Sequence, residues 1–250
     1  MGEPGAYIES TGDGDYFPMN PEGKFSTQTK LTYKISLNDK LSYGILWEKK
    51  NWRKYAHSFK YNPDGDYRRY KTAYMNNLIW THTFSSRTYF TLKFANFFNE
   101  YRRYVYEDPF DSRYVDPHRL DSGYVFHTGG MEMGHYKRNT TTYIGKLDIE
   151  SQVTKNHMIK MGVEAKSHKL FLHEFKLIPK LDATGNEIYP FEPDIPEITT
   201  SKHNRYTQHP CEASAYIQDK MEFKALIVNC LLYTSPSPRD LSTSRMPSSA

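Results

Sequence analysis

The feature that most constrains the fold is an alternation of side-chain character, with a period of two residues, that recurs along most of the chain. In FSTQTKLTYKISL, residues 25–37, every odd position is apolar, aromatic or Thr, and every even position is polar. Successive side chains of a β-strand point to opposite faces, so this pattern predicts a strand with one apolar and one polar face. An α-helix would spread the same residues around its circumference.

The same alternation predicts several further strands. They are centred on residues 41–48, 68–84, 90–95, 143–150, 159–166 and 212–220, and a last strand begins near Ala225. Aromatic residues make up 15% of the chain, with 21 Tyr and 14 Phe, yet the mean hydropathy is −0.77. Many Tyr and Thr in a polar chain are typical of strands that bury one face only.

The connections between these strands alternate in length. Tight turns are predicted near residues 38–39, 85–86, 154–156 and 221–224, and long segments rich in turn formers at 57–67, 104–138 and 173–205. Successive connections of an up-and-down antiparallel sheet lie at opposite ends. We therefore expect all tight turns at one end of the sheet and all long loops at the other.

This asymmetry is typical of outer-membrane barrels, which have short turns on one side, long loops on the other and strands that are apolar outward. The predicted strands are longer than the about 9–11 residues that a tilted strand needs to cross the hydrocarbon region of a membrane. The sequence has no run of about 18 apolar residues and therefore predicts no membrane-spanning helix. The sequence thus predicts an all-β fold, an antiparallel up-and-down transmembrane β-barrel fragment of about eight long strands, as a curved sheet that need not close. A soluble β-sandwich also explains the alternation, but it has shorter strands and no such loop asymmetry.

Two stretches resemble a known family. In EASAYIQDKMEFKALIVN, residues 212–229, Ala215 to Asp219 match a strand of the type a-Y-x-Q-D, and residues 226–229 match the approach to a following N-x-G-x-R motif, whose Gly and Arg do not appear. LIWTHTFSSRTYFTLKF, residues 78–94, looks like a hairpin of the same family. Both stretches resemble the TonB-dependent outer-membrane receptors.

The resemblance implies a barrel of about 22 strands with a plug inside it. It implies energy-coupled uptake of a bulky nutrient, such as a chelate, a saccharide or a peptide, through the outer membrane of a Gram-negative-type bacterium. Its partners would be outer-membrane lipid and, through a plug region that this chain lacks, the TonB complex. We expect residues 25–229 to form part of such a barrel and residues 1–24 to be the end of an external loop; the transported substrate is not predicted.

The segment from Cys230 to Ala250 has a different resemblance. CLLYTSPSPRD and RMPSSA look like the translated fixed parts of a transposase-type sequencing adapter. We therefore expect residues 230–250 to be a non-native, disordered tail without packing partners, as opposed to a natural disordered C-terminus. The codons of the coding DNA test this interpretation directly.

The candidate ligand-binding residues are aromatic and basic side chains of the loop after residue 103. They are Tyr104, Tyr106, Arg113, Tyr114 and Arg119. Rings and guanidinium groups can stack on a sugar, a chelate or a peptide, but the same side chains can equally pack against a neighbouring loop.

No other pattern predicts a chemical site. HTGGMEMGH, residues 127–135, and the two Asp-Gly-Asp-Tyr stretches at 13–16 and 64–67 are interpreted as loops and turns, so no metal or cofactor is predicted. No catalytic motif is present. The net charge is +4, and Lys and Arg are interleaved with Asp and Glu, so no basic block predicts binding of nucleic acid. The two cysteines lie far apart in the sequence and predict no disulfide framework. The alternatives left open are an outer-membrane barrel enzyme and a soluble or cell-surface β-rich binding module.

Overall fold

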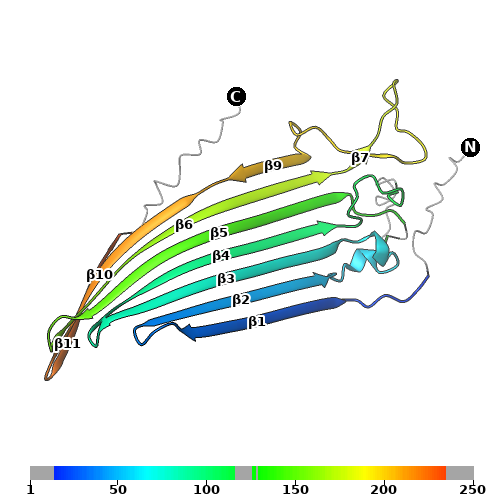
Figure 1. Ribbon diagram of the computed structural model, residues 1–250. Helices are drawn as coiled ribbons and strands as arrows, with labels where there is room; N and C mark the ends of the chain where they lie inside the picture. The colour runs from blue at the N-terminus through cyan, green and yellow to red at the C-terminus, as the bar shows by residue number, and fades with distance from the viewer. Residues whose placement is uncertain (1–13, 116–125, 128, 235–250) are drawn as a thin grey trace, which may run out of the picture.

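The computed structural model describes residues 14–115, 126–127 and 129–234. Eight strands lie side by side in one antiparallel sheet in the order β1-β2-β3-β4-β5-β6-β10-β11, and a further strand, β9, pairs with the end of β6 (Figure 1). Their bounds are β1 Glu22–Lys34, β2 Asp39–Trp52, β3 Arg68–Ser85, β4 Thr88–Tyr104, β5 Gly134–Gln152, β6 His157–Lys176, β9 His203–Gln208, β10 Cys211–Phe223 and β11 Leu226–Thr234.

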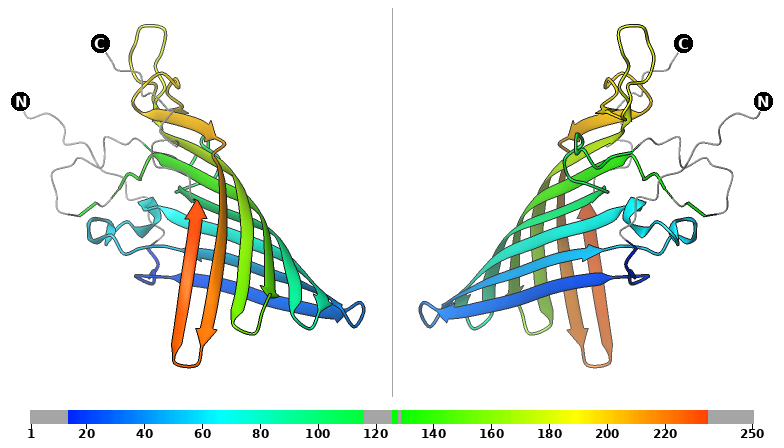
Figure 2. Two further views of the ribbon diagram at one scale, coloured as in Figure 1. Left: turned by 90° about the vertical axis from the view of Figure 1, so that its left-hand side faces the viewer. Right: turned by 90° about the vertical axis from the view of Figure 1, so that its right-hand side faces the viewer.

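The sheet is curved and open. Figure 2 shows it bent into a trough, with β1 at one edge and β11 at the other. Within the described residues β1 pairs with β2 alone and β11 with β10 alone. The prediction of an all-β, antiparallel, up-and-down sheet of about eight long strands is therefore confirmed.

Short and long connections lie at opposite ends of the sheet, as predicted (Figure 1). The short ones are residues 35–38, 86–87, 153–156 and 224–225, and the long ones are residues 53–67, 105–133 and 177–202. The long connections contain two 3-10 helices, η1 His57–Phe59 and η2 Pro63–Gly65, and a small ladder of β7 (Ile178–Pro179) with β8 (Pro193–Asp194). No helix within the described residues has the length and apolar character needed to cross a membrane.

Two predicted loop boundaries were wrong. The loop expected at 104–138 ends earlier because β5 starts at Gly134, and the loop expected at 173–205 loses residues to both β6 and β9. The ends of these strands consist of polar residues such as Lys137 and Arg138, which show no alternation of apolar and polar side chains. They still pair with β4. Strand ends that stand clear of the apolar region need no apolar face, so hydrophobic periodicity misses them.

The register places large apolar side chains on one face of the sheet. Leu78 lies opposite Phe94, Leu92 opposite Leu147, and Leu147 opposite Val163. Several of these side chains are strongly exposed, including Phe94 at 52% and Val163 at 53%. We call this side the apolar face; large exposed apolar patches mark surfaces that contact a partner or a membrane.

The apolar face carries an uncharged band that ends at charged residues on both sides. On β2 the band lies between Asp39 and Lys49, and on β6 between His157 and Lys169, with no Asp, Glu, Lys or Arg on this face in between. On β4 it spans residues 90–98 and ends before Glu100. A stretch of this length matches the about 9–11 residues with which a tilted strand crosses the hydrocarbon.

The opposite face is polar, and its charges are paired both across strands and within one strand. Lys93 and Lys146 both lie within ion-pair distance of Asp148, at 3.6 and 3.4 Å. The same face carries the pairs Lys160–Glu150 and Lys166–Glu164, both at 2.8 Å. Each of these pairs has at least one partly exposed partner, and they balance the charge along this face.

This polar face is the concave one. Side chains crowd together on the inner side of a curved sheet, and the strand residues buried in mid-sheet lie here: Ser42, Ala73, Thr142 and Asp148, all at most 7% exposed. The arrangement is that of a barrel wall, apolar outside and polar inside.

A long-range hydrogen bond on the concave face depends on one glycine. The Tyr216 hydroxyl of β10 donates to Asp148 Oδ1 of β5 at 2.7 Å, although β6 lies between the two strands. The intervening residue of β6 is Gly162, where a Cβ would lie 2.5 Å from Tyr216 Cε1 and 2.7 Å from Asp148 Oδ1. The absence of a side chain at Gly162 is what lets the tyrosine reach across.

The last strand differs from the prediction for the C-terminal segment. Residues 230–234 continue β11 and pair with residues 215–219 of β10, so the expectation that residues from Cys230 onward have no packing partners is wrong for these five. Leu231 to Thr234 contain no Gly or Pro and have side chains favoured in strands, so they extend the ladder that begins at Leu226. Residues 235–250 lie outside the described residues.

The glycine contact gives a first prediction. Gly162→Ala should lower the free energy of unfolding by about 1–3 kcal/mol, because the added methyl group collides with Tyr216 and Asp148. Urea unfolding in detergent micelles measures this loss. Gly145→Ala is the matched control, since a Cβ there meets Phe94 at an ordinary 3.9 Å; equal stability of the two variants would contradict the close contact.

Candidate functional site

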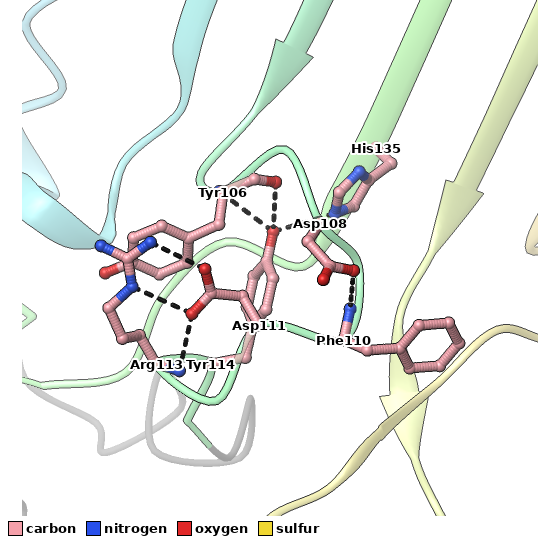
Figure 3. A network of polar contacts seen from close by, with 7 residues as sticks. All are labelled: Tyr106, Asp108, Phe110, Asp111, Arg113, Tyr114 and His135. Atoms are coloured by element: carbon pink, nitrogen blue, oxygen red, sulfur yellow. Dashed lines mark hydrogen bonds and ion pairs between the residues drawn. The ribbon is translucent and has the colours of Figure 1, made fainter.

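The loop predicted to bind a ligand is instead held together by its own side chains (Figure 3). Tyr114 is 3% exposed, and its hydroxyl donates to the Tyr106 carbonyl at 3.1 Å and accepts from the Tyr106 amide at 3.2 Å. The same hydroxyl lies 2.9 Å from His135 Nε2. Burial raises the pKa of Tyr114 to about 12, so this ring is a buried, neutral part of the loop and is not open to a ligand.

The remaining candidates also contact neighbouring side chains, although the Arg113 side chain is 66% exposed. Tyr104 is 8% exposed and stacks on Tyr70, with ring centroids 5.1 Å apart. Arg113 donates to both carboxylate oxygens of Asp111, at 2.9 and 2.7 Å, and lies 4.0 Å over the Tyr106 ring. Arg119 lies outside the described residues. These contacts fit packing within the loops, and ligand binding by this group stays a prediction.

The loop core explains a second sequence pattern. Met131 and Met133 of HTGGMEMGH are 2% and 1% exposed and pack with Val105, Tyr114 and Phe175 in one buried cluster. His135 stacks on Phe175 at 4.9 Å. These side chains close the loop end of β4, β5 and β6, and the described residues contain no group of three or more His, Cys, Asp or Glu that could hold a metal ion.

A cavity at the loop end lies elsewhere. A cavity of about 410 Å³ opens between the segment before β1 and the loop that joins β2 to β3. Its lining consists of Gly14, Asp15, Tyr16, Phe17, Pro18, Met19, Arg53, Lys54, Tyr55, Ala56, Phe59, Lys60, Tyr61, Pro63, Asp64 and Asp66. We call it the loop cavity; its volume is in the range of about 300–1,000 Å³ typical of small-molecule sites.

Arg53 holds the two walls of the loop cavity together. Its side chain is 8% exposed, donates from Nη1 to the Pro63 carbonyl at 2.7 Å and lies 3.5 Å from Asp64. Its guanidinium group also lies 4.3 Å over the Phe17 ring. The second Asp-Gly-Asp-Tyr stretch is thus a 3-10 turn, η2, whose first Asp serves this ion pair.

The chemistry of the loop cavity suits non-covalent binding. The rings of Tyr16, Tyr55 and Tyr61 are exposed, and Lys60 lies 5.1 Å over the Tyr61 ring. Asp66 brings a carboxyl group whose pKa is raised by burial. Aromatic rings beside positively and negatively charged side chains can hold an amphipathic ligand.

Sequence reasoning missed the loop cavity because its residues come from two loops about 40 positions apart, as Tyr16 and Tyr61 illustrate. The sequence signal was a local density of Tyr and Phe in both segments. Nothing in the sequence places those segments side by side; the pairing of Arg53 N with the Pro21 carbonyl does so at the start of β1.

Removing the Arg53 side chain should loosen the loop cavity. Arg53→Ala leaves the Pro63 carbonyl and Asp64 without this partner, a loss of about 1–3 kcal/mol. Amide hydrogen exchange over residues 57–66 should become about tenfold faster or more, since each 1.4 kcal/mol of lost local stability is about tenfold. Lys54→Ala, an exposed neighbour in the same wall, should leave exchange unchanged; equal effects of the two would contradict the role of Arg53.

The pH dependence of the Asp111–Arg113 pair gives another prediction. Hydrogen bonds from the Arg113 side chain, then from its backbone N–H, lower the pKa of Asp111 from 3.8 to about 2. A lowered folded pKa means that the stabilisation is present above pH 3.8 and is lost as the pH falls through about 2. In Arg113→Gln the NMR titration of the Asp111 carboxyl carbon should move back toward 3.8, whereas Arg102→Gln should not move it; an unchanged midpoint in Arg113→Gln would refute the pairing.

Comparison with known proteins identifies a fold and no family. Neither a protein-family model nor a curated protein sequence matches the chain. Among solved structures, the chain is similar to the outer membrane transporter YddB from Escherichia coli, with a TM-score of 0.54 and 11% identity over 86% of this chain. It spans 27% of that transporter's chain. At this identity the similarity concerns the fold: the curved sheet described above has the strand arrangement of part of an outer-membrane transporter.

Proposed function

We propose that this chain forms part of the wall of a TonB-dependent receptor that takes up a bulky nutrient through the outer membrane. In this proposal the apolar face contacts outer-membrane lipid, the concave face lines the passage, and the loops at the long-loop end capture the ligand. The separation of the two faces is the observation that carries the proposal. Exposed Phe, Tyr, Val and Leu side chains gather on one side, and ion pairs between and within strands gather on the other.

The geometry of the uncharged band supports insertion into a membrane. The band is bounded by Asp39 and His157 at the turn end and by Lys49 and Lys169 at the loop end. A charged side chain at the bilayer midplane of a barrel costs about 2–4 kcal/mol, whereas one at the interface costs little. Charges at both ends and none between are therefore what a lipid-facing wall requires.

The local structure of the stretch that resembles the receptor family supports the proposal. Residues 215–219 fall within β10, which ends at a tight turn before β11. Tyr216 of this stretch points to the concave face, where it bonds Asp148. The similarity to an outer membrane transporter at the level of the fold agrees with this placement.

The mechanism in this proposal needs no covalent step. A chelate, a saccharide or a peptide binds at the loops by stacking and hydrogen bonding, and the TonB complex supplies the energy through the plug region of the receptor. The loop cavity, with its exposed rings and mixed charges, is the described feature that suits ligand capture.

The two faces can be distinguished with tryptophan fluorescence in lipid nanodiscs. Trp80 lies on the apolar face opposite Leu41 and Leu92, whereas Trp52 lies on the concave face opposite Arg69. Lipids brominated on their acyl chains should quench Trp80 strongly in the variant Trp47→Phe/Trp52→Phe, because bromine quenches on contact. They should leave Trp52 nearly unaffected in the matched variant Trp47→Phe/Trp80→Phe.

Aqueous iodide should give the opposite order, with Trp52 the more accessible residue. Equal quenching of Trp52 and Trp80 by brominated lipid, or none of Trp80, would contradict the proposed membrane wall.

A further inference from the structure

Two histidine side chains meet where the long loop of residues 177–202 returns to the sheet. The strand β9 pairs with the loop end of β6 (Figure 1), and the register places His203 opposite Phe175 and Arg205 opposite His173. Since alternate residues of a strand share a face, His173 and His203 lie on one face, diagonally across the two strands. On β6 this is the side of the apolar face, and His173 lies beyond Lys169, where the uncharged band ends.

The two rings point their Nε2 atoms at each other. His173 Nε2 and His203 Nε2 are 3.0 Å apart, and the ring centroids are 5.1 Å apart. On its other side, His203 Nδ1 lies 2.6 Å from the Pro196 carbonyl oxygen. A carbonyl oxygen can only accept, so a neutral His203 carries its proton on Nδ1 and a lone pair on Nε2. The lone pair therefore faces His173.

This arrangement is the one that imidazole ligands of a metal ion adopt. Metal-bound histidines usually donate their second N–H to a backbone carbonyl or a carboxylate, which fixes the tautomer and the ring orientation. Two nitrogens that each lie about 2.0–2.1 Å from one ion are about 2.9 Å apart at a right angle and about 3.3 Å apart at a tetrahedral angle. The observed separation of 3.0 Å lies within that range. A rotation of the His173 ring is then enough to bring both lone pairs onto one ion.

The floor beneath the two histidines is apolar and fixed in place. Phe175 is 6% exposed, belongs to the buried loop cluster, and its ring centroid is 5.0 Å from that of His173 and 5.5 Å from that of His203. Next to it, the Lys176 amide donates to the Lys202 carbonyl at 3.0 Å. Both histidines remain partly exposed, so an ion can enter from solvent.

The surroundings keep His173 neutral. Burial, followed by the neighbouring His203, Arg205 and Lys137, lowers the pKa of His173 below 6.5. An imidazole must be unprotonated to bind a metal ion. Arg205 and Lys137 lie opposite His173 on its two sides, and Lys137 also lies 3.3 Å from Glu100. Their positive charge opposes a dication, which favours the ion that binds imidazole most tightly.

The two histidines are the protein ligands that the geometry supplies. The neighbouring His135 stacks on Phe175 at 4.9 Å, and its Nε2 lies 2.9 Å from the Tyr114 hydroxyl, so that nitrogen already has a partner. Water would complete the coordination of an ion held by two imidazoles. Among divalent first-row ions Cu²⁺ binds nitrogen ligands most tightly, and it prefers the square geometry in which two ligands meet near a right angle.

We propose that His173 and His203 form a binding site for a divalent transition-metal ion, with Cu²⁺ bound more tightly than Ni²⁺ or Zn²⁺. An ion there joins β9 to β6 through side chains and holds the end of the loop 177–202 against the sheet. The site lies on the outer side of the wall, away from the concave face, and the inference does not depend on the proposed function. The alternative is a hydrogen bond from His173 to His203 without an ion.

The test titrates Cu²⁺ into the untagged protein in dodecyl maltoside micelles, with Cys211 and Cys230 replaced by Ser. Electron paramagnetic resonance should show one saturable site per chain with coupling to two imidazole nitrogens. His173→Gln should weaken binding about tenfold or more, because the loss of a second-shell partner alone costs about 10–100-fold in metal affinity. This variant removes no contact between His203 and Pro196, so the loop keeps its own anchor.

His57→Gln is the matched control. His57 is an exposed histidine of another long loop, where its Nδ1 lies 2.8 Å from the Tyr55 hydroxyl, and its replacement should leave the affinity for Cu²⁺ unchanged. Coupling to a single nitrogen, unchanged binding in His173→Gln, or equal weakening by both variants would overturn the metal site and leave the hydrogen-bonded pair.

Amide hydrogen exchange gives a second readout of the same site. Zn²⁺ at about 100 times its Kd should slow exchange over residues 196–206 by up to about 100-fold, because an ion that binds only the closed loop stabilises it by mass action. The same addition should have no effect on this segment in His173→Gln. Exchange that Zn²⁺ leaves unchanged in the unsubstituted protein would refute the clamping of the loop.

Discussion

The register between neighbouring strands is the constraint on which the rest of the structure depends. Each strand alternates, so a slip of one residue would exchange its apolar and polar faces. In the observed register, Phe94 lies between Leu78 of β3 and Gly145 of β5 on the apolar face, while Lys93 lies within ion-pair distance of Asp148 on the concave face. A slip between β4 and β5 would place lysine beside the exposed apolar side chains and separate it from its carboxylate. Both consequences disfavour any other register.

The concave face adds contacts that adjacent strands alone cannot provide. Tyr216 reaches Asp148 across Gly162, and Trp52 reaches Tyr101 across β3. Such contacts require curvature, because side chains on a flat sheet stand about a strand spacing apart. The curvature that creates a barrel wall therefore also brings together the rings and cations at its loop end.

The strands and the two-ended arrangement of their connections were predictable from the sequence. The alternation of apolar and polar residues is a local property, and successive side chains of a strand point to opposite faces of the sheet. Strand ends such as Lys137 and Arg138 were not, since polar residues beyond the apolar band carry no period. Tyr104 and Tyr114 were recognised as prominent but not as buried. Tyr104 packs against Tyr70 and His135, and Tyr114 against Met133 and Phe175, and these partners lie far away along the chain. The loop cavity was missed for the same reason. The pairing of residues 230–234 was missed because an edge strand accepts any compatible segment, whatever its resemblance.

The most direct test of the account is a spin-label scan along β4 from Phe90 to Phe98 in lipid nanodiscs, with Cys211 and Cys230 replaced by Ser. Oxygen concentrates in the bilayer and a nickel chelate in water, so their relative access to each label reports which side it faces. The account predicts a strict period of two, with oxygen dominant at 90, 92, 94, 96 and 98 and the nickel chelate dominant at 91, 93, 95 and 97. Nickel access that is equal at odd and even positions, without oxygen enrichment at either, would contradict a membrane wall.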